Sequence, residues 1–226
     1  MPFSQSHLIK AMVFDFDGTL AILNIDFGFM RERVLHWMKG FGIGEERIKE
    51  KYLLEIIDEV YHLLLEEDSA SGAERFYHGA HQILQEVELE AAGEGRLIPG
   101  SKETLTFLRQ KEMRVGIVTR NCEEAVRKVF PNINAYCDAF VSRDSVKRVK
   151  PHPDHLVSVM KALKVSEEKA VMIGDHVLDI QAGKRVGMKT IGVLTGRIKK
   201  EEFEKAGADY ILRDVSEICE WLEDKR

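Results

Sequence analysis

The sequence has few cysteines and no long hydrophobic run. Its three cysteines are an odd number at spacings that match no metal or redox motif, so we expect reduced, structural thiols. No apolar stretch approaches the roughly 20 residues that span a bilayer. The first residues also lack the charged start, apolar stretch and small-residue cleavage site of a signal peptide. These absences predict a cytoplasmic protein with no membrane partner.

Neither sign of charge is in large excess. The chain holds 33 Lys and Arg against 38 Asp and Glu, a net charge of −5 at pH 7. Residues 20–98 carry the acidic excess, with 8 basic against 16 acidic residues, whereas the rest has 25 against 22. A slightly basic part of the chain suits a phosphate dianion, and the lack of a strongly basic stripe argues against a nucleic acid as the main partner.

Two residue patterns that could suggest a binding site are weak. The glycines of Gly40–Gly44 lack the spacing of a phosphate-binding loop, and no Lys-Ser/Thr pair follows them, so we expect a turn between two helices. His78 and His81 have helical i, i+3 spacing, which is more often found on a surface than at a metal. No role is predicted for the other histidines.

Apolar runs of strand length alternate with helix-like stretches over most of the chain. Strands are predicted at 8–16, 114–119, 139–142, 169–174, 189–194 and 209–212. Helices are predicted at 101–112, 122–130, 153–164, 177–186 and 214–223. Because parallel strands need crossover helices, this alternation predicts an α/β fold: a three-layer, doubly wound parallel sheet.

The segment from 21 to 98 breaks this alternation and shows no convincing strand. One apolar stripe at helical spacing includes Ile56, Val60 and Leu64, and a second runs from Phe76 to Val87. We therefore predict an inserted all-α domain at 21–98, within a core domain formed by 1–20 and 99–226. The connections are expected near 20–25, at Ala91–Gly95 and at Pro99–Gly100.

A candidate active-site motif, Asp15-Phe16-Asp17-Gly18-Thr19, follows the apolar run Met12–Phe14. Side chains two positions apart at a strand end point the same way, so the carboxylates of Asp15 and Asp17 face together. Two such carboxylates can hold a cation and attack a phosphorus atom. A capping Asp and a glycine turn that merely close a strand are the alternative interpretation.

Further polar residues follow other predicted strands. Thr119 follows Val115–Val118, Lys150 comes after Phe140-Val141, and Asp175 with Asp179 follows Val171–Gly174; each group lies at a predicted carboxyl end. Open α/β sheets bind ligands at that edge, so the topology is expected to gather these side chains in one crevice. Chance alone would then require four independent coincidences.

The pieces DFDGTL, VTRN, VKPHPD and GDHVLD make the chain resemble the haloacid dehalogenase-like superfamily of phosphohydrolases over essentially its whole length. The helical insert after the first motif resembles the cap of the subgroup that includes phosphoglycolate phosphatases and β-phosphoglucomutases. The resemblance implies a Rossmann-like core with an inserted helical cap.

The chemistry of the four aspartates and this resemblance together imply catalytic and metal-binding roles for them. Asp15 would be both the nucleophile and a ligand of Mg²⁺, with Asp175 as a second carboxylate ligand. The backbone carbonyl of Asp17 would be a third ligand, by resemblance only. Asp179, at i+4 from Asp175, would support the metal or Lys150. The Asp17 side chain would be the general acid and base, which favours phosphate esters over carbon–halogen bonds.

The predicted phosphate-binding residues are Gly18, Thr119, Arg120, Asn121 and Lys150. Thr119 offers a hydroxyl, and the backbone N–H groups after it are expected to face the phosphate where a helix begins. Lys150 supplies positive charge between phosphate and carboxylates. Arg120 either adds a second cation for the substrate or points to solvent.

The predicted function is that of a Mg²⁺-dependent phosphatase. It would act on a small phosphorylated metabolite, phosphoglycolate-like by resemblance, through an aspartyl-phosphate intermediate. Two alternatives stay open: a phosphosugar mutase, and a non-catalytic binding or regulatory module on the same fold. A pure binding module would have no need for Asp17.

Overall fold

The structure is a computed structural model that describes residues 9–67 and 69–223. Residues 1–8, which include the start of the first predicted strand, lie outside the described residues. The chain divides into two compact units, Met1–Leu23 with Ala92–Arg226, and Asn24–Ala91. We call them the core unit and the helical unit.

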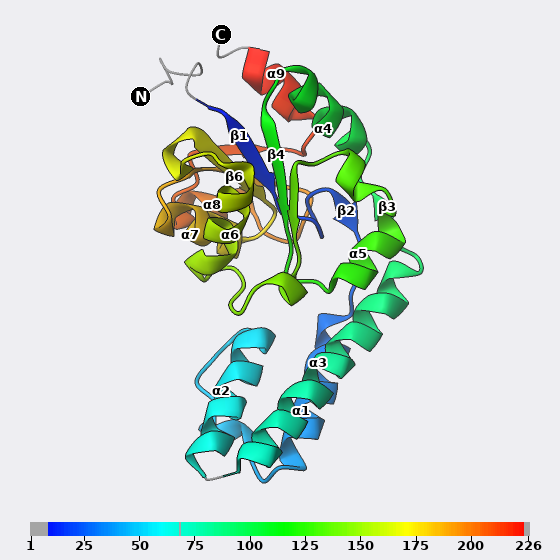
Figure 1. The fold of residues 1–226 in the computed structure, drawn as a ribbon, viewed down its shortest axis with the longest axis vertical. Coiled ribbons are helices and arrows are strands. Elements are labelled where there is room, and N and C mark those ends of the chain that lie inside the picture. The colour runs from blue at the N-terminus through cyan, green and yellow to red at the C-terminus, as the bar shows by residue number, and fades with distance from the viewer. Residues whose placement is uncertain (1–8, 68, 224–226) are drawn as a thin grey trace. The chain divides into compact units, whose positions relative to one another are not determined.

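The core unit contains a sheet of six parallel strands (Figure 1). Their order in the sheet is β5-β4-β1-β6-β7-β8. The strands are β1 (Ala11–Phe14), β4 (Arg114–Val118), β5 (Ala139–Val141), β6 (Ala170–Gly174), β7 (Lys189–Val193) and β8 (Tyr210–Leu212). The predicted α/β class and parallel sheet are confirmed.

Helices cover both faces of this sheet (Figure 1). One face carries α4 (Ser101–Gln110), α5 (Glu123–Val129) and α9 (Glu217–Glu223), and the other carries α6 (Pro153–Leu163), α7 (Val177–Arg185) and α8 (Lys200–Ala206). Because both faces are covered, β1 is buried at every position, as parallel strands are, instead of alternating. Val13 and Met172 pack with Leu156 and Val159 of α6 in one buried cluster.

The helical unit consists mainly of α1 (Phe27–Lys39), α2 (Leu53–Glu66) and α3 (Ala70–Ala92), the last of which ends at the unit's boundary. Asp26 caps α1, since its carboxylate accepts a 2.9 Å hydrogen bond from Phe29 N. The predicted turn at Gly40–Gly44 lies between α1 and α2. Within the described residues, no helix is long and apolar enough to cross a membrane.

Three details of the sequence prediction were wrong. The 21–98 segment carries short strands at its ends, since β2 (Ala21–Ile22) pairs antiparallel with β3 (Arg96–Leu97). Strands of this length are too short to show a two-residue period. The return connection begins later than predicted, because α3 continues to Ala92. Finally, α8 was not predicted, since Phe203 is its only buried residue and gives no helical stripe.

Candidate active site

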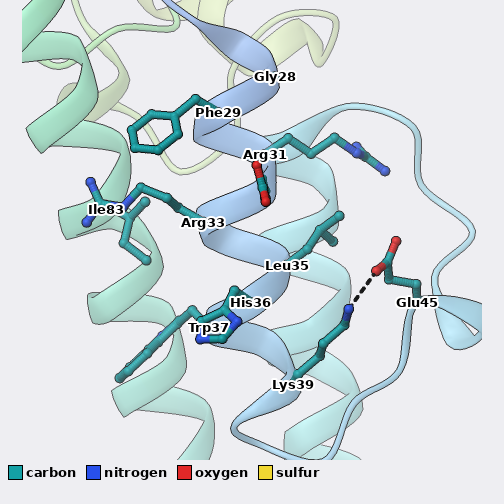
Figure 2. A pocket seen from close by; sticks show the side chains of 11 residues that line it. Gly28, Phe29, Arg31, Arg33, Leu35, His36, Trp37, Lys39, Glu45 and Ile83 are labelled. Carbon is teal, nitrogen blue, oxygen red and sulfur yellow. Dashed lines mark ion pairs between the residues drawn. The ribbon is translucent and has the colours of Figure 1, made fainter.

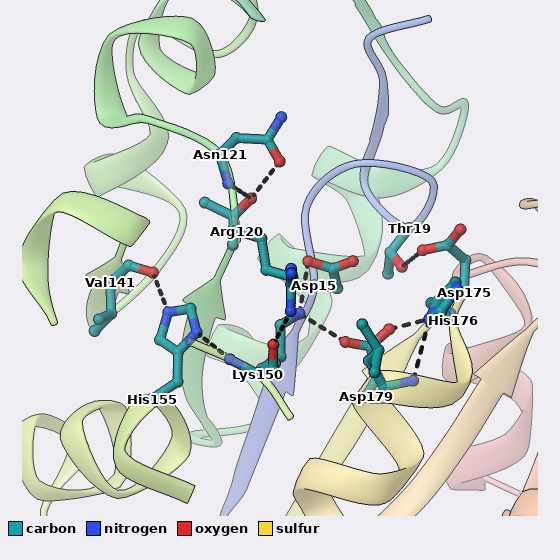
Figure 3. A network of polar contacts seen from close by, with 12 residues as sticks. Asp15, Thr19, Arg120, Asn121, Val141, Lys150, His155, Asp175, His176 and Asp179 are labelled. Carbon is teal, nitrogen blue, oxygen red and sulfur yellow. Dashed lines mark hydrogen bonds and ion pairs between the residues drawn. The ribbon is translucent and has the colours of Figure 1, made fainter. Parts of the chain in front are cut away.

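The predicted residues lie at the carboxyl ends of neighbouring strands (Figure 3). Asp15 directly follows β1, and its N–H donates to Ile173 O on β6 at 2.8 Å. Thr119 directly follows β4, and its N–H donates to Val141 O on β5 at 3.1 Å. Asp175 directly follows β6. The sheet therefore brings these segments to one edge.

Lys150 is the charged centre of the site. Its Nζ lies 2.7 Å from Asp15 Oδ1 and 2.6 Å from Asp179 Oδ1, and its side chain is 1% exposed. Burial disfavours the ammonium group, but the two carboxylates outweigh this, so the pKa of Lys150 is raised. The lysine therefore stays charged between its two partners.

Three carboxylates form the one cluster of metal-ligand type among the described residues. Asp15, Asp175 and Asp179 each offer an oxygen atom, and these atoms lie within 4.8 Å of one another. Burial, together with the charges of Asp15, Asp179 and Asp17, raises the pKa of Asp175 to about 9 despite the opposing effect of Lys150. Burial also raises the pKa of Asp15, with Lys150 opposing it. Crowded carboxylates of this kind fit a hard divalent cation.

Asp17 is not a member of this cluster. Its Oδ1 accepts a 2.9 Å hydrogen bond from Leu23 N, which fixes the direction of the carboxylate. The two carboxylate oxygens of Asp179 have different partners: Oδ1 contacts Lys150 Nζ, and Oδ2 accepts a 3.1 Å hydrogen bond from His176 N. Asp15, Asp175 and Asp179 therefore form the cluster, and the carboxylate of Asp17 is held outside it by Leu23 N.

Asn121 presents an unsatisfied donor near the same edge. Thr119 is fully buried, and its Oγ1 donates to Asn121 Oδ1 at 3.1 Å and accepts from Asn121 N at 3.2 Å. Asn121 is 7% exposed, and in the described part of the chain its Nδ2 has no hydrogen-bond partner. The contact with Thr119 is made by the other end of the amide, Oδ1. A buried amide without a partner calls for an explanation such as a bound anion.

Two of the backbone N–H groups predicted to face a phosphate already have acceptors in the chain. Asn121 N donates to Thr119, and Glu123 N donates to Asp144 Oδ2 at 2.7 Å. The guanidinium of Arg120 is not simply turned to solvent, because its Nη1 donates to the backbone carbonyl of Lys150. Its predicted contact with a substrate stays a prediction.

Comparison with known proteins decides the family. Residues 12–193 match the model of the family described as haloacid dehalogenase-like hydrolase. The chain belongs to this family. The predicted family and the prediction of a hydrolase are confirmed.

Two relatives show how far the likeness extends. A haloacid dehalogenase-like hydrolase domain-containing protein from Arabidopsis thaliana is 26% identical over 229 residues, covering 95% of this chain and 84% of that protein. Pyrophosphatase PpaX from Bacillus cereus is 28% identical over 221 residues, covering 96% and 97%. The fold of a haloacid dehalogenase-like hydrolase from Bacteroides fragilis aligns with a TM-score of 0.68 at 23% identity, covering 93% of this chain and 99% of that one.

Two residues that the sequence analysis missed lie against the carboxylate cluster of this haloacid dehalogenase-like chain. Thr195 and Gly196 follow β7, and Thr195 Oγ1 donates to the backbone carbonyl of Gly18. A Cβ on Gly196, or on Gly18 with its φ of +83°, would overlap the Asp175 carboxylate. Their position just past the carboxyl end of a strand was the signal that could have revealed them.

Gly196→Ala is expected to displace Asp175 and weaken Mg²⁺ binding by about 10-fold or more, because residues that orient a ligand act on metal affinity. Titration calorimetry with Mg²⁺ measures the effect. Gly28→Ala is the control, since it adds the same methyl group to the exposed first turn of α1. Unchanged affinity in Gly196→Ala would show that this close approach does not position Asp175.

The affinity for Mg²⁺ is also expected to rise with pH. Asp175, with its pKa raised to about 9, must release its proton before it can bind a cation, so affinity should increase by up to about tenfold per unit below that value. The same shift makes the metal-free protein less stable as pH rises from 3.8 towards about 9, because the folded state holds this proton more tightly.

Calorimetry in two buffers of different ionisation enthalpy counts the protons released. The Asp175→Asn variant should release fewer protons. Affinity independent of pH across the neutral range, with no proton release, would contradict the prediction.

A cavity also lies within the helical unit (Figure 2). It has a volume of about 630 Å³, and none of the predicted site residues lines it. Its cations have partners already: Arg33 pairs with Glu86 at 2.8 Å and Lys39 with Glu45 at 3.1 Å. We assign it no role in the chemistry.

Proposed function

We propose that the protein is a Mg²⁺-dependent phosphatase that hydrolyses a small soluble phosphomonoester through an aspartyl-phosphate on Asp15. The observation that carries this proposal is Lys150 Nζ held 2.7 Å from Asp15 and 2.6 Å from Asp179, beside the third carboxylate of Asp175. The family membership and the name of a relative, pyrophosphatase PpaX, support hydrolysis of a phosphoryl group. The resemblance of the motifs and the helical insert favours a phosphoglycolate-like substrate.

The reaction proceeds in two displacements. A carboxylate oxygen of Asp15 forms a bond to phosphorus as the bond to the leaving oxygen breaks, and Asp17 gives that oxygen a proton. Asp17, now ionised, takes a proton from a water molecule, which forms a new bond to phosphorus. The Asp15–phosphate bond breaks and inorganic phosphate leaves, which restores the free carboxylate of Asp15 and the protonated carboxyl of Asp17.

The remaining residues would bind the metal ion and the phosphate group and keep them in place. Asp15, Asp175 and the carbonyl of Asp17 would hold Mg²⁺, which supplies positive charge between the anionic nucleophile and the anionic phosphate. Asp179 supports Lys150 through its 2.6 Å contact. Lys150, Thr119, Asn121 and Gly18 would bind the phosphate oxygens, and the unpaired Nδ2 of Asn121 supports this assignment. Arg120 is the fifth residue of the proposed phosphate-binding set.

A substrate panel tests the proposal. Phosphate release is measured with phosphoglycolate, sugar phosphates, nucleotides, pyrophosphate and p-nitrophenyl phosphate, with Mg²⁺ and with chelator. Metal-dependent release from a phosphomonoester is the expected result. Conversion of a sugar phosphate to its isomer without release would favour the mutase instead. No turnover by the folded, Mg²⁺-loaded protein would contradict a catalytic role.

A further inference from the structure

Lys150 reaches its partners from a segment with little regular structure. Between β5, which ends at Val141, and α6, which begins at Pro153, the only regular element is a 3₁₀ turn at Arg143–Ser145. The lysine side chain is long and flexible, so its ammonium group can lie between two carboxylates only if the backbone is held in place.

Both backbone polar atoms of Lys150 are held by side chains (Figure 3). Its N–H donates to His155 Nδ1 at 3.2 Å, and its carbonyl accepts from Arg120 Nη1. The other ring nitrogen of His155, Nε2, lies 3.1 Å from Val141 O at the end of β5. The imidazole therefore connects Lys150 to the sheet.

These partners fix the state of the ring. Nδ1 must accept and Nε2 must donate, which is possible only for the neutral imidazole with its proton on Nε2. His155 is fully buried, and burial together with the charge of Lys150 lowers its pKa to about 3. The ring keeps this one tautomer throughout the neutral range.

We propose that His155 is a positioning residue of the active site, whose imidazole ties the Lys150 backbone to β5 so that Nζ lies between Asp15 and Asp179. This inference rests on the proposed function for its kinetic consequence. His155 lies outside the carboxylate cluster, and its proposed role acts through the backbone of Lys150.

The test compares His155→Asn with His155→Leu in the intact chain. The two side chains have the same number and branching of heavy atoms, but only Asn offers an acceptor near the position of Nδ1. Thr104→Val is the control, because it removes another buried hydrogen bond, from Thr104 Oγ1 to Val215 O, far along the chain from Lys150. His155→Phe is a further variant that lacks the acceptor but fills the volume of the ring.

Two measurements are made on each variant that unfolds cooperatively on heating. One is the rate at which an amine-reactive acylating reagent modifies Lys150. Peptide mass spectrometry measures this rate relative to the rate for exposed lysines. The other is steady-state phosphate release. The acylation rate needs no turnover, so it still decides the inference if the wild-type protein proves inactive and the proposed function fails.

In the Leu or Phe variant we expect Lys150 acylation to rise at least about tenfold, and kcat/KM to fall about 100-fold, mainly in kcat, because small misplacements are costly. His155→Asn should keep most of the protection of Lys150 from acylation and most of kcat/KM. Thr104→Val should lower the melting temperature but change neither the acylation rate nor kcat/KM. Full protection of Lys150 in a folded Leu or Phe variant would overturn the inference. Equal behaviour of Asn and Leu would also overturn it.

Discussion

Asp15→Asn is expected to lower the rate of phosphate release by about four to six orders of magnitude, as loss of a covalent nucleophile does. An amide oxygen is a far weaker nucleophile than a carboxylate, and the variant loses a negative charge 2.7 Å from Lys150 Nζ. Single-turnover and steady-state phosphate release measure the effect.

The fold should survive this change. Burial raises the pKa of Asp15 in spite of Lys150, so in the metal-free protein an ionised Asp15 costs stability at neutral pH, and neutral Asn relieves this cost. We expect a melting temperature equal to or above that of the wild type without metal. Activity above about one hundredth of wild type, after deamidation is excluded by mass spectrometry, would contradict the role of Asp15.

Asp138→Asn is the matched control for charge removal. Asp138 precedes β5 at the opposite end of the strands from the site, where it pairs with Arg114 at 3.0 Å and accepts from Val115 N at 2.8 Å. Its replacement removes one carboxylate from the core unit and should lower stability slightly while leaving turnover intact. A large loss of turnover in this control would mean that charge alone explains the effect at Asp15.

Asp17→Asn is expected to lower kcat by about 100-fold to 10,000-fold for an alkyl phosphate, the range for loss of general acid–base catalysis. The hydrogen bond from Leu23 N to Oδ1 can be kept by the amide oxygen of Asn, so the loop should keep its shape. The effect therefore reports on the proton and not on folding.

The identity of the leaving group sharpens this prediction. A weakly basic leaving group such as p-nitrophenolate needs no proton, so phosphorylation of Asp15 should be much less affected with p-nitrophenyl phosphate than with an alkyl phosphate. A rapid burst of p-nitrophenol followed by slow turnover is expected, because the second step still lacks its base. Equal losses in the first step for both substrates would contradict the acid role of Asp17.

The sequence was sufficient to predict the core sheet because its strands are buried on both faces. Runs such as Val115–Val118 and Val171–Ile173 stand out as continuous apolar stretches, and the residues just after them fall at one sheet edge by topology alone. The same logic places Asp15, Thr119 and Asp175. It needs no side-chain detail.

What the sequence could not show depends on tertiary contacts. The role proposed for His155 rests on two hydrogen bonds to residues 5 and 14 positions away, which no local pattern encodes. Gly196 matters because its backbone lies close to the carboxylate of Asp175, which is 21 positions earlier in the chain. The β2 and β3 pair has no periodicity to read. Such features follow from packing rather than from spacing.

The central claim, that Asp15 becomes phosphorylated, is tested most directly by acid-quenching the wild-type protein during turnover with Mg²⁺ and a rapidly cleaved phosphomonoester, then mapping its peptides by mass spectrometry. We expect one phosphoryl group on the peptide that contains Asp15, absent in Asp15→Asn and lost on mild alkaline treatment. Persistent phosphorylation of the Asp15→Asn protein would contradict the mechanism. A burst of p-nitrophenol from the Asp17→Asn protein with no phosphorylated peptide would also contradict it, because the aspartyl-phosphate is expected to break down slowly in that variant.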